Sequence, residues 1–218
     1  MQKAALILEG GAKRGVFTSG VLDYLMEQEY YIPHVIGVSA GSCNAVDYVS
    51  RQPGRTKACM IRSGEDGKII NFHNFFQTKS LLDMDLIFER DPKELHPFDF
   101  DTYFASDMTC EIVVTNCESG QAEYYSEKED GDRLMQLCRA SSSMPLVTPM
   151  VEIDGTPYLD GGIADSIPYE HALAEGCDRL IVVLTRERGY VKKTEKAVRF
   201  TDKLYKKYPK IVESMDSR

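Results

Sequence analysis

Ser39 stands in a five-residue pattern that can turn a serine into a nucleophile. The segment Gly37-Val38-Ser39-Ala40-Gly41 matches G-x-S-x-G, in which a sharp strand-to-helix turn lifts the hydroxyl out of a sheet while the glycines relieve crowding. The structural alternative is a serine that only caps the helix beginning at Ala40, because serine is a favoured N-cap. The two roles are compatible, and the pattern favours a nucleophile elbow.

A serine nucleophile also needs hydrogen-bond donors for the oxyanion that forms when it attacks a carbonyl group. Residues 9–15 read Glu-Gly-Gly-Ala-Lys-Arg-Gly, a loop of mostly small residues between a strand and a helix, where backbone N–H groups favour anions. Such loops also bind dinucleotide phosphates, but Ala12 interrupts the G-x-G-x-x-G fingerprint, and the sequence has no Gly-Lys-Ser/Thr of a P-loop. Taken alone, the loop leaves packing and anion binding both open.

The base that would take the serine proton is either a histidine or a carboxylate. Of the four histidines, His171 is the strongest candidate, because Ser39, Asp160 and His171 follow the chain order of an α/β-hydrolase triad. His171 falls within residues 168–174, however, which we expect to be a helix rather than a loop beyond a strand. Asp160 begins an Asp-Gly-Gly turn, and the residues alone leave both bases open.

The composition indicates one globular domain. The 218 residues are 43% hydrophobic and 28% charged, close to the globular average, and the chain is long enough for one substantial core. A net charge of −8 argues against a nucleic-acid partner, because phosphate binding needs a basic face. No apolar stretch approaches the roughly 20 residues that span a bilayer, and no cleavable leader is evident, so we expect a cytoplasmic protein.

No feature of the sequence calls for a metal or a cofactor. The six cysteines lack C-x-x-C or histidine-rich spacing, which fits reduced core thiols better than a zinc site or a disulfide framework. Acidic clusters of the calcium-loop type are also missing from the sequence. We therefore expect no metal and no cofactor.

The elements around these residues alternate between short apolar runs and amphipathic stretches. Continuous apolar runs are typical of strands buried on both faces of a parallel sheet, and Asp154-Gly155 predicts a two-residue hairpin that leads into Asp160. The expected fold class is α/β, with a mainly parallel central sheet flanked by helices. Strands are expected at residues 4–8, 35–38, 111–115, 122–125, 151–153, 156–158 and 180–184, and helices at 17–28, 40–49, 132–139 and 168–174.

Three ordered motifs together resemble the bacterial branch of the patatin-like phospholipase family. They are the glycine loop at residues 10–15, the serine pattern at residues 37–41 and the late Asp160-Gly161-Gly162 turn. The similarity extends to about residue 188 and includes Ala-Ser-Ser-Ser-Met-Pro at residues 140–145. It implies a patatin-like fold around a G-x-S-x-G nucleophile elbow.

The resemblance further implies a Ser–Asp dyad that works without a histidine. Ser39 would attack an ester carbonyl while Asp160 accepts its proton, and Asp160 would then activate the water that hydrolyses the acyl-enzyme. The substrate would be a phospholipid, a lysophospholipid or another fatty-acyl ester, and the mechanism needs no metal or cofactor.

The same resemblance assigns the oxyanion hole to the first glycine loop. Backbone N–H groups of Gly10, Gly11 and Ala12 would hold the oxyanion, with Arg14 ordering the loop or adding positive charge. Ala12 departs from the glycine that is usual in the family. Its N–H donor is kept, but its backbone has less freedom than that of glycine.

The chain divides into a catalytic domain at residues 1–188 and a basic helical segment at residues 189–218. Residues 53–107 are expected to form a cap or substrate channel, because their apolar clusters have no clean period. From Arg186 to Lys210 there are ten Lys/Arg against three Asp/Glu, a local charge of +7 that leaves −15 elsewhere. The candidate channel residues are Phe72, Phe75, Phe76, Leu81, Leu82, Met84, Ile87 and Phe88.

Two readings of the basic segment stay open, as do two other functions of the whole chain. An amphipathic helix with its lysines in solvent would be ordinary structure, whereas the same lysines near an anionic bilayer would give peripheral membrane contact. Besides the Ser–Asp hydrolase, the alternatives are a Ser-His-Asp esterase that uses His171 on small esters and a non-catalytic lipid- or nucleotide-binding protein.

Overall fold

The computed structural model describes residues 3–62, 80–191 and 204–216. Its centre is a seven-stranded sheet in the order β5-β6-β3-β2-β1-β7, with β4 also paired to β3. The strands are β1 (Ala4–Leu8), β2 (His34–Val38), β3 (Thr109–Asn116), β4 (Ala122–Tyr125), β5 (Val151–Ile153), β6 (Thr156–Asp160) and β7 (Arg179–Val183).

The sheet has a parallel part of four strands and an antiparallel part of three strands. β7, β1, β2 and β3 run parallel to one another, whereas β4 and β6 are antiparallel to β3 and β5 is antiparallel to β6. The expected hairpin at Asp154-Gly155 is confirmed, and it supplies two of the three antiparallel strands, β5 and β6. It brings Asp160 opposite Val114 of β3, close to the carboxyl end of the parallel strands.

Helices cover both faces of the sheet, because side chains along each strand alternate between the faces. Leu6 and Leu8 of β1 belong to the larger core, with residues of the helices that pack on that face. Ala5 and Ile7 point the other way, towards Ala172 of α7. The helices are α1 (Gly15–Glu27), α2 (Ala40–Val49), α3 (Arg55–Met60), the π-helix η2 (Leu86–Leu95), α5 (Phe100–Ala105), α6 (Gly131–Ser141), α7 (Tyr169–Ala174) and α9 (Pro209–Asp216).

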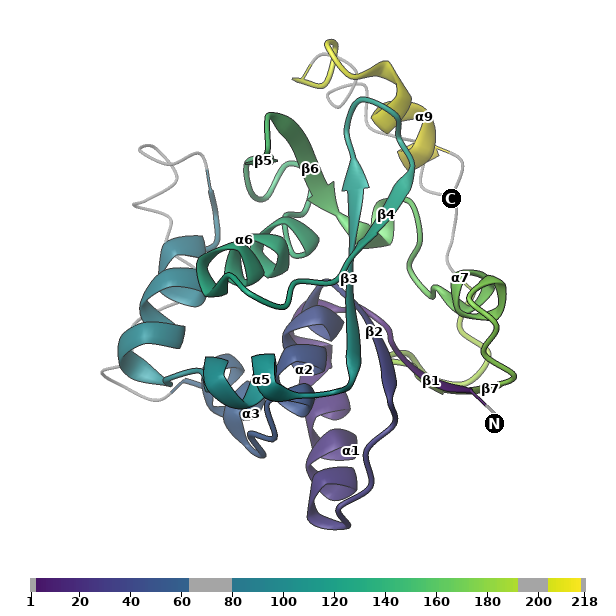
Figure 1. The fold of residues 1–218 in the computed structure, drawn as a ribbon. Coiled ribbons are helices and arrows are strands. Elements are labelled where there is room, and N and C mark those ends of the chain that lie inside the picture. Colours follow the sequence, from purple (N-terminus) through teal and green to yellow (C-terminus); the bar gives the residue numbers. More distant parts are fainter. Residues whose placement is uncertain (1–2, 63–79, 192–203, 217–218) are drawn as a thin grey trace.

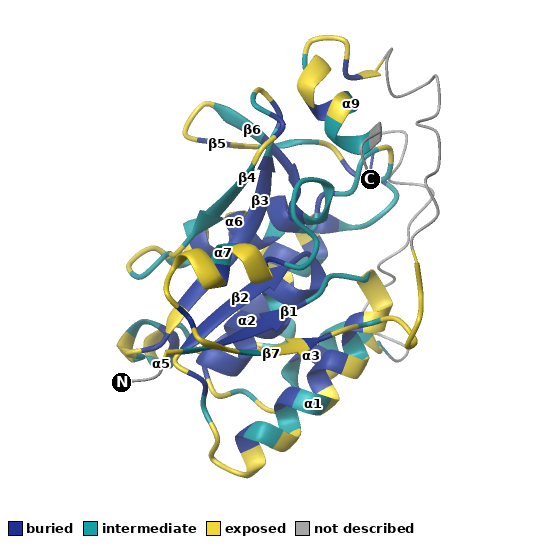
Figure 2. Ribbon diagram, turned by 90° about the vertical axis from the view of Figure 1, so that its right-hand side faces the viewer, coloured by how far each residue is buried: buried dark blue, intermediate teal, exposed yellow. Residues whose placement is uncertain are grey.

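The position of β7 differs from the one expected from the sequence. Its apolar run predicted a strand buried on both faces, but β7 is an edge strand, and within the described ranges it pairs with β1 alone. Ile181 and Val182 are 41% and 38% exposed, and the strand lies at the margin of the sheet in Figure 2. An apolar run indicates β structure without indicating whether a strand is central or at an edge.

The C-terminal segment is not one continuous helix in its described part. The chain turns at residues 205–207 and α9 begins at Pro209, because proline can start a helix but cannot continue one. Tyr205 and Ile211 are buried against the body, and Ser214 Oγ donates to Gly120 O at the β3–β4 turn (Figure 1). The lysines expected between residues 192 and 203 lie outside the described residues, and the division at residue 188 stays a prediction.

Within the described parts of the chain, no helix combines the length and apolar character that crossing a membrane requires.

Candidate active site

Ser39 lies in the tight connection between β2 and α2. Its φ of 55° and ψ of −126° place a non-glycine residue in the left-handed half of backbone space, a strain that is stored where function requires an unusual geometry. The side chain makes no capping hydrogen bond to α2, so the purely structural interpretation of Ser39 as a helix cap is wrong.

The two glycines of the serine pattern are needed for close packing. A Cβ atom on Gly37 would stand 2.5 Å from the carbonyl oxygen of Gly41, and one on Gly41 would stand 2.2 Å from the carbonyl oxygen of Leu8. Both distances are shorter than any ordinary van der Waals contact. Any side chain at either position would therefore push α2 away from the sheet and displace Ser39.

Asp160, at the end of β6, meets Ser39 directly. Ser39 Oγ donates to Asp160 Oδ2 at 2.6 Å, and the N–H of Gly162 donates to Asp160 Oδ1 at 2.8 Å. Both partners are buried. Burial raises the pKa of Asp160 to about 6, against the opposing effect of the hydrogen bonds from Ser39 and Gly162. Gly161 leaves no room for a Cβ atom, which would stand 2.2 Å from the carbonyl oxygen of Val113.

The glycine loop reaches the same place from β1. A Cβ atom on Gly10 would stand 2.9 Å from that of Ser39, so the loop and the serine are in direct contact. Gly11 and Ala12 both have positive φ, at 152° and 48°. At Ala12 this conformation is sterically strained, because alanine, unlike glycine, has a Cβ atom. Arg14 is exposed and lines the cavity above the serine.

Two anchors of this site were missed by sequence reasoning. Thr185, just after β7, donates from its N–H to Glu9 Oε2 at 2.5 Å and from its hydroxyl to Gly10 O at 2.7 Å. Ser141 accepts from the N–H of Ser39 at 2.8 Å and donates to Val113 O at 2.7 Å. The serine run at residues 140–145 was the signal for Ser141, and the signal for Thr185 was its place directly after an apolar run.

His171 belongs to a different network. It lies on α7 as expected, where its Nε2 is 3.1 Å from Glu111 Oε2 and its ring stacks on Tyr124. Glu111 also contacts His34 at 2.6 Å. Burial would raise the pKa of Glu111, but the hydrogen bonds and charges of the two histidines outweigh burial and lower it. The structure thus joins His171 to Glu111 and not to Ser39 or Asp160.

An apolar cavity of about 410 Å³ opens beside Ser39, within the range of small-molecule sites. Of the expected channel residues, Leu82, Met84, Ile87 and Phe88 line it, and Leu81 does not. The three candidate phenylalanines at positions 72, 75 and 76 lie outside the described residues. Further lining residues come from α2, α3 and α6, which sequence reasoning did not assign to the channel.

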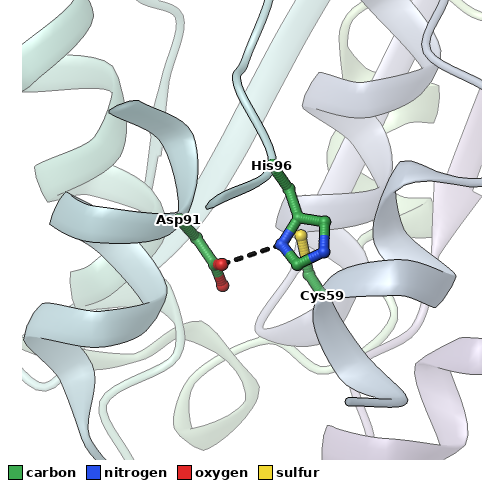
Figure 3. Close-up of side chains that lie close together, drawn as sticks. All are labelled: Cys59, Asp91 and His96. Atoms are coloured by element: carbon green, nitrogen blue, oxygen red, sulfur yellow. Dashed lines mark hydrogen bonds and ion pairs between the residues drawn. The ribbon is translucent and has the colours of Figure 1, made fainter. Parts of the chain in front are cut away.

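Cys59, Asp91 and His96 converge between α3 and the π-helix η2, with one ligand-type atom of each within 4.8 Å of the others (Figure 3). Asp91 Oδ1 is 2.9 Å from His96 Nδ1, and the other oxygen of Asp91 pairs with Arg62. Burial raises the pKa of Cys59 to about 11, so its thiol is neutral. Because the arginine would repel a cation, we interpret the cluster as a network that joins α3 to η2.

Comparison with known proteins gives a family, a curated relative and a solved structure. The patatin-like phospholipase family matches residues 6–173. The uncharacterized protein YjjU of Escherichia coli (strain K12) is 29% identical over 188 residues, which cover 84% of this chain and 52% of YjjU. The crystal structure of VipD from Legionella pneumophila shares the fold, with a TM-score of 0.52 and 16% identity over 83% of this chain and 49% of VipD.

The chain spans about half the length of both proteins. The family match itself includes the glycine loop, Ser39 and Asp160. Because that match covers most of the sequence, the chain belongs to the patatin-like phospholipase family.

Proposed function

We propose that the protein is a lipid acyl hydrolase in which Ser39 and Asp160 form the catalytic dyad. The observation that carries this proposal is the 2.6 Å hydrogen bond from Ser39 Oγ to Asp160 Oδ2 at the mouth of an apolar cavity. Membership of a lipase family supports the reaction class. The substrate is a phospholipid or another fatty-acyl ester.

In the first half-reaction, Asp160 takes the hydroxyl proton as Ser39 Oγ attacks the carbonyl carbon. The raised pKa of Asp160, about 6, supports this role, because a base whose pKa lies nearer the operating pH transfers protons more easily. Protonated Asp160 then gives its proton to the departing alcohol, which leaves an ester between Ser39 and the acyl group. Water reverses the sequence with Asp160 again as base, and the fatty acid is released.

The oxyanion would be held by backbone N–H groups of Gly10, Gly11 and Ala12. These groups precede the first turn of α1, where N–H donors lack partners within the helix. Thr185 holds the loop through hydrogen bonds to Glu9 and Gly10, and Arg14 adds positive charge at the cavity wall. Preorganised donors of this kind typically contribute about 10²–10³ in rate each.

Ser39→Ala and Asp160→Asn test the dyad. Each variant should lose hydrolysis of p-nitrophenyl butyrate by about 10³-fold or more and keep its thermal unfolding midpoint or raise it. A fluorophosphonate probe should label the wild-type protein and not Ser39→Ala. Turnover near the wild-type level in either variant would show that the substituted residue is not catalytic. No turnover by the wild-type protein, together with no probe labelling, would instead favour a non-catalytic lipid-binding protein.

A cytoplasmic location with peripheral contact at anionic bilayers completes the proposal. Lys206, Lys207 and Lys210 are exposed on the C-terminal segment, and each basic residue near such a surface contributes roughly 1 kcal/mol. The acidic remainder of the chain opposes binding only weakly, because charges beyond a Debye length of about 8 Å are screened.

A further inference from the structure

Three of the helices that line the cavity beside Ser39, α2, α3 and α6, order its wall by distance from the serine; η2 and the residues before it complete the wall. On α2 the wall runs from Ser39 through Cys43 to Asp47, at intervals of four residues, so these positions share one face of the helix. At 1.5 Å per residue, Cys43 lies about 6 Å and Asp47 about 12 Å along the axis from Ser39.

The other two helices give the same order. The C-terminal end of α6 touches the serine, since Ser141 Oγ accepts from the Ser39 N–H, and the wall then runs back along α6 to Cys138 and Met135. On α3, as on α6, the residue numbers fall with distance from Ser39. Met60 lies near the start of α1, where its Cε would be 3.2 Å from a Cβ atom on Gly15, and Arg55 lies at the far end.

Cys43 and Cys138 therefore line the middle of the cavity, and Cys59 lines it next to Met60, nearer the serine. All three are free thiols, and burial raises the pKa of Cys43 and of Cys59 to about 11. The thiols are neutral at physiological pH and behave as small apolar groups. A hydrocarbon chain thus meets no charge over this stretch.

The far end is different in character. Arg55 Nη1 donates to Asp47 Oδ1 at 2.7 Å, and Thr56 Oγ1 donates to Asp47 Oδ2 at 2.5 Å. Asp47 is 3% exposed, so this ion pair is buried and depends on its internal partners. An alkyl chain cannot replace these hydrogen bonds, and it would gain no apolar contact by reaching the ion pair.

We propose that this cavity measures the acyl chain and selects medium-length chains of about eight to ten carbons, with Cys43 at half depth and the Asp47–Arg55 pair as the stop. The proposal rests on the proposed function, since it assigns the carbonyl end of the chain to Ser39. An extended alkyl chain with C–C bonds near 1.5 Å advances about 1.3 Å per carbon. The roughly 12 Å from Ser39 to Asp47 therefore accommodates about nine carbons.

A series of p-nitrophenyl esters from butyrate to hexadecanoate, each kept below its aggregation concentration, tests the proposed chain-length selectivity. For wild-type protein, kcat/KM should rise by about fourfold per added methylene, the factor expected for burial of one CH₂ group, and should stop rising between eight and ten carbons. A continuous rise to hexadecanoate would overturn the proposal. Absence of turnover with every ester, together with no fluorophosphonate labelling, would overturn the dyad instead.

Cys43→Leu places a larger side chain at half depth. The break in the series should move to about five carbons, so that the ratio of kcat/KM for decanoate over butyrate falls at least tenfold. Cys110→Val replaces a fully buried cysteine that lies outside the cavity with a larger side chain, and it should leave this ratio at the wild-type value. An unchanged ratio in Cys43→Leu, with normal probe labelling, would show that Cys43 does not touch the chain.

Removing the buried ion pair should lengthen the acyl-chain cavity. The double substitution Asp47→Leu with Arg55→Met exchanges the buried pair for apolar side chains, a change that proteins often tolerate. The break should then move to twelve carbons or more, while a break that stays at ten carbons would exclude the ion pair as the stop. Should the double variant fail to fold, Met135→Ala deepens the same end and should move the break in the same direction.

Discussion

The hydroxyl oxygen of Ser39 lies 2.6 Å from a carboxylate oxygen of Asp160, although 121 residues separate the two in sequence. One comes from the turn after a parallel strand and the other from the end of an antiparallel hairpin. Their meeting depends on β3, which pairs with both β2 and β6.

The first prediction is a pH dependence of activity. Asp160 must be ionised to accept a proton, and its pKa is raised to about 6 by burial. We expect kcat/KM for p-nitrophenyl butyrate to fall about tenfold per pH unit below pH 6 and to level off above pH 7. A profile that levels off already at pH 4 would mean that the acting carboxylate is not buried.

The second prediction concerns stability at the same residue. The folded protein holds a proton on Asp160 between about pH 4 and pH 6 where the unfolded chain has lost it, so stability falls as pH rises through that window. Raising the pKa of Asp160 from 3.8 to about 6 costs about 3 kcal/mol of stability at most. The free energy of unfolding of Asp160→Asn minus that of the wild type, measured in urea, should therefore be larger at pH 7 than at pH 4. An equal difference at the two pH values would contradict the raised pKa.

Two helical glycines provide a matched pair of substitutions. Gly41→Ala would bring a Cβ atom to 2.2 Å from a backbone oxygen, and it should destabilise the protein by about 3 kcal/mol or more. Gly20 in α1 has no atom within 4 Å of its Cβ position, so Gly20→Ala should stabilise by about 0.5–1 kcal/mol. Thermal unfolding of both variants measures the contrast, and similar midpoints would contradict it.

His171→Ala separates the dyad from a triad. Because His171 is bonded to Glu111 on the other face of the sheet, we expect esterase activity within threefold of wild type. Stability should fall, because Glu111 and Tyr124 lose a partner. A loss of activity by 10³ or more, the order expected for a general base, would favour the triad esterase.

The basic C-terminal segment is tested with vesicles. Lys203, Lys206, Lys207 and Lys210 changed together to Gln should reduce co-sedimentation with vesicles containing anionic lipid, and wild-type binding should weaken at high salt. Hydrolysis of a soluble ester should be unaffected. Binding that ignores both salt and anionic lipid would leave the lysines with a purely structural role.

Much of the site could be predicted because its signals are local. The positions of β2, Ser39 and α2 follow from a strand pattern, two glycines and a helix pattern within fifteen residues, and Asp160 follows from the Asp-Gly hairpin before it. The sheet order could not be read in the same way, because pairing between distant strands leaves no mark on either strand alone. The edge position of β7 is an example.

The anchors of the site were hidden for a similar reason. Ser141 and Thr185 act through contacts across 102 and 176 residues, and neither belongs to a motif with a fixed spacing from Ser39. The cavity walls on α2 and α3 were also missed, because residues such as Cys43 and Thr56 are indistinguishable from core residues until the helices are placed.

The bonds from Thr185 to Glu9 and to Gly10 tie the loop beside Ser39 to the outermost strand of the sheet. That strand has one neighbour among the described residues, and two of its apolar side chains face solvent. This edge of the sheet is thus hydrogen-bonded to the loop of the candidate active site. Whatever loosens β7, whether heat, denaturant or a substitution at Ile181, should disturb the loop before the main core unfolds, so loss of activity should precede loss of helical signal during gradual denaturation.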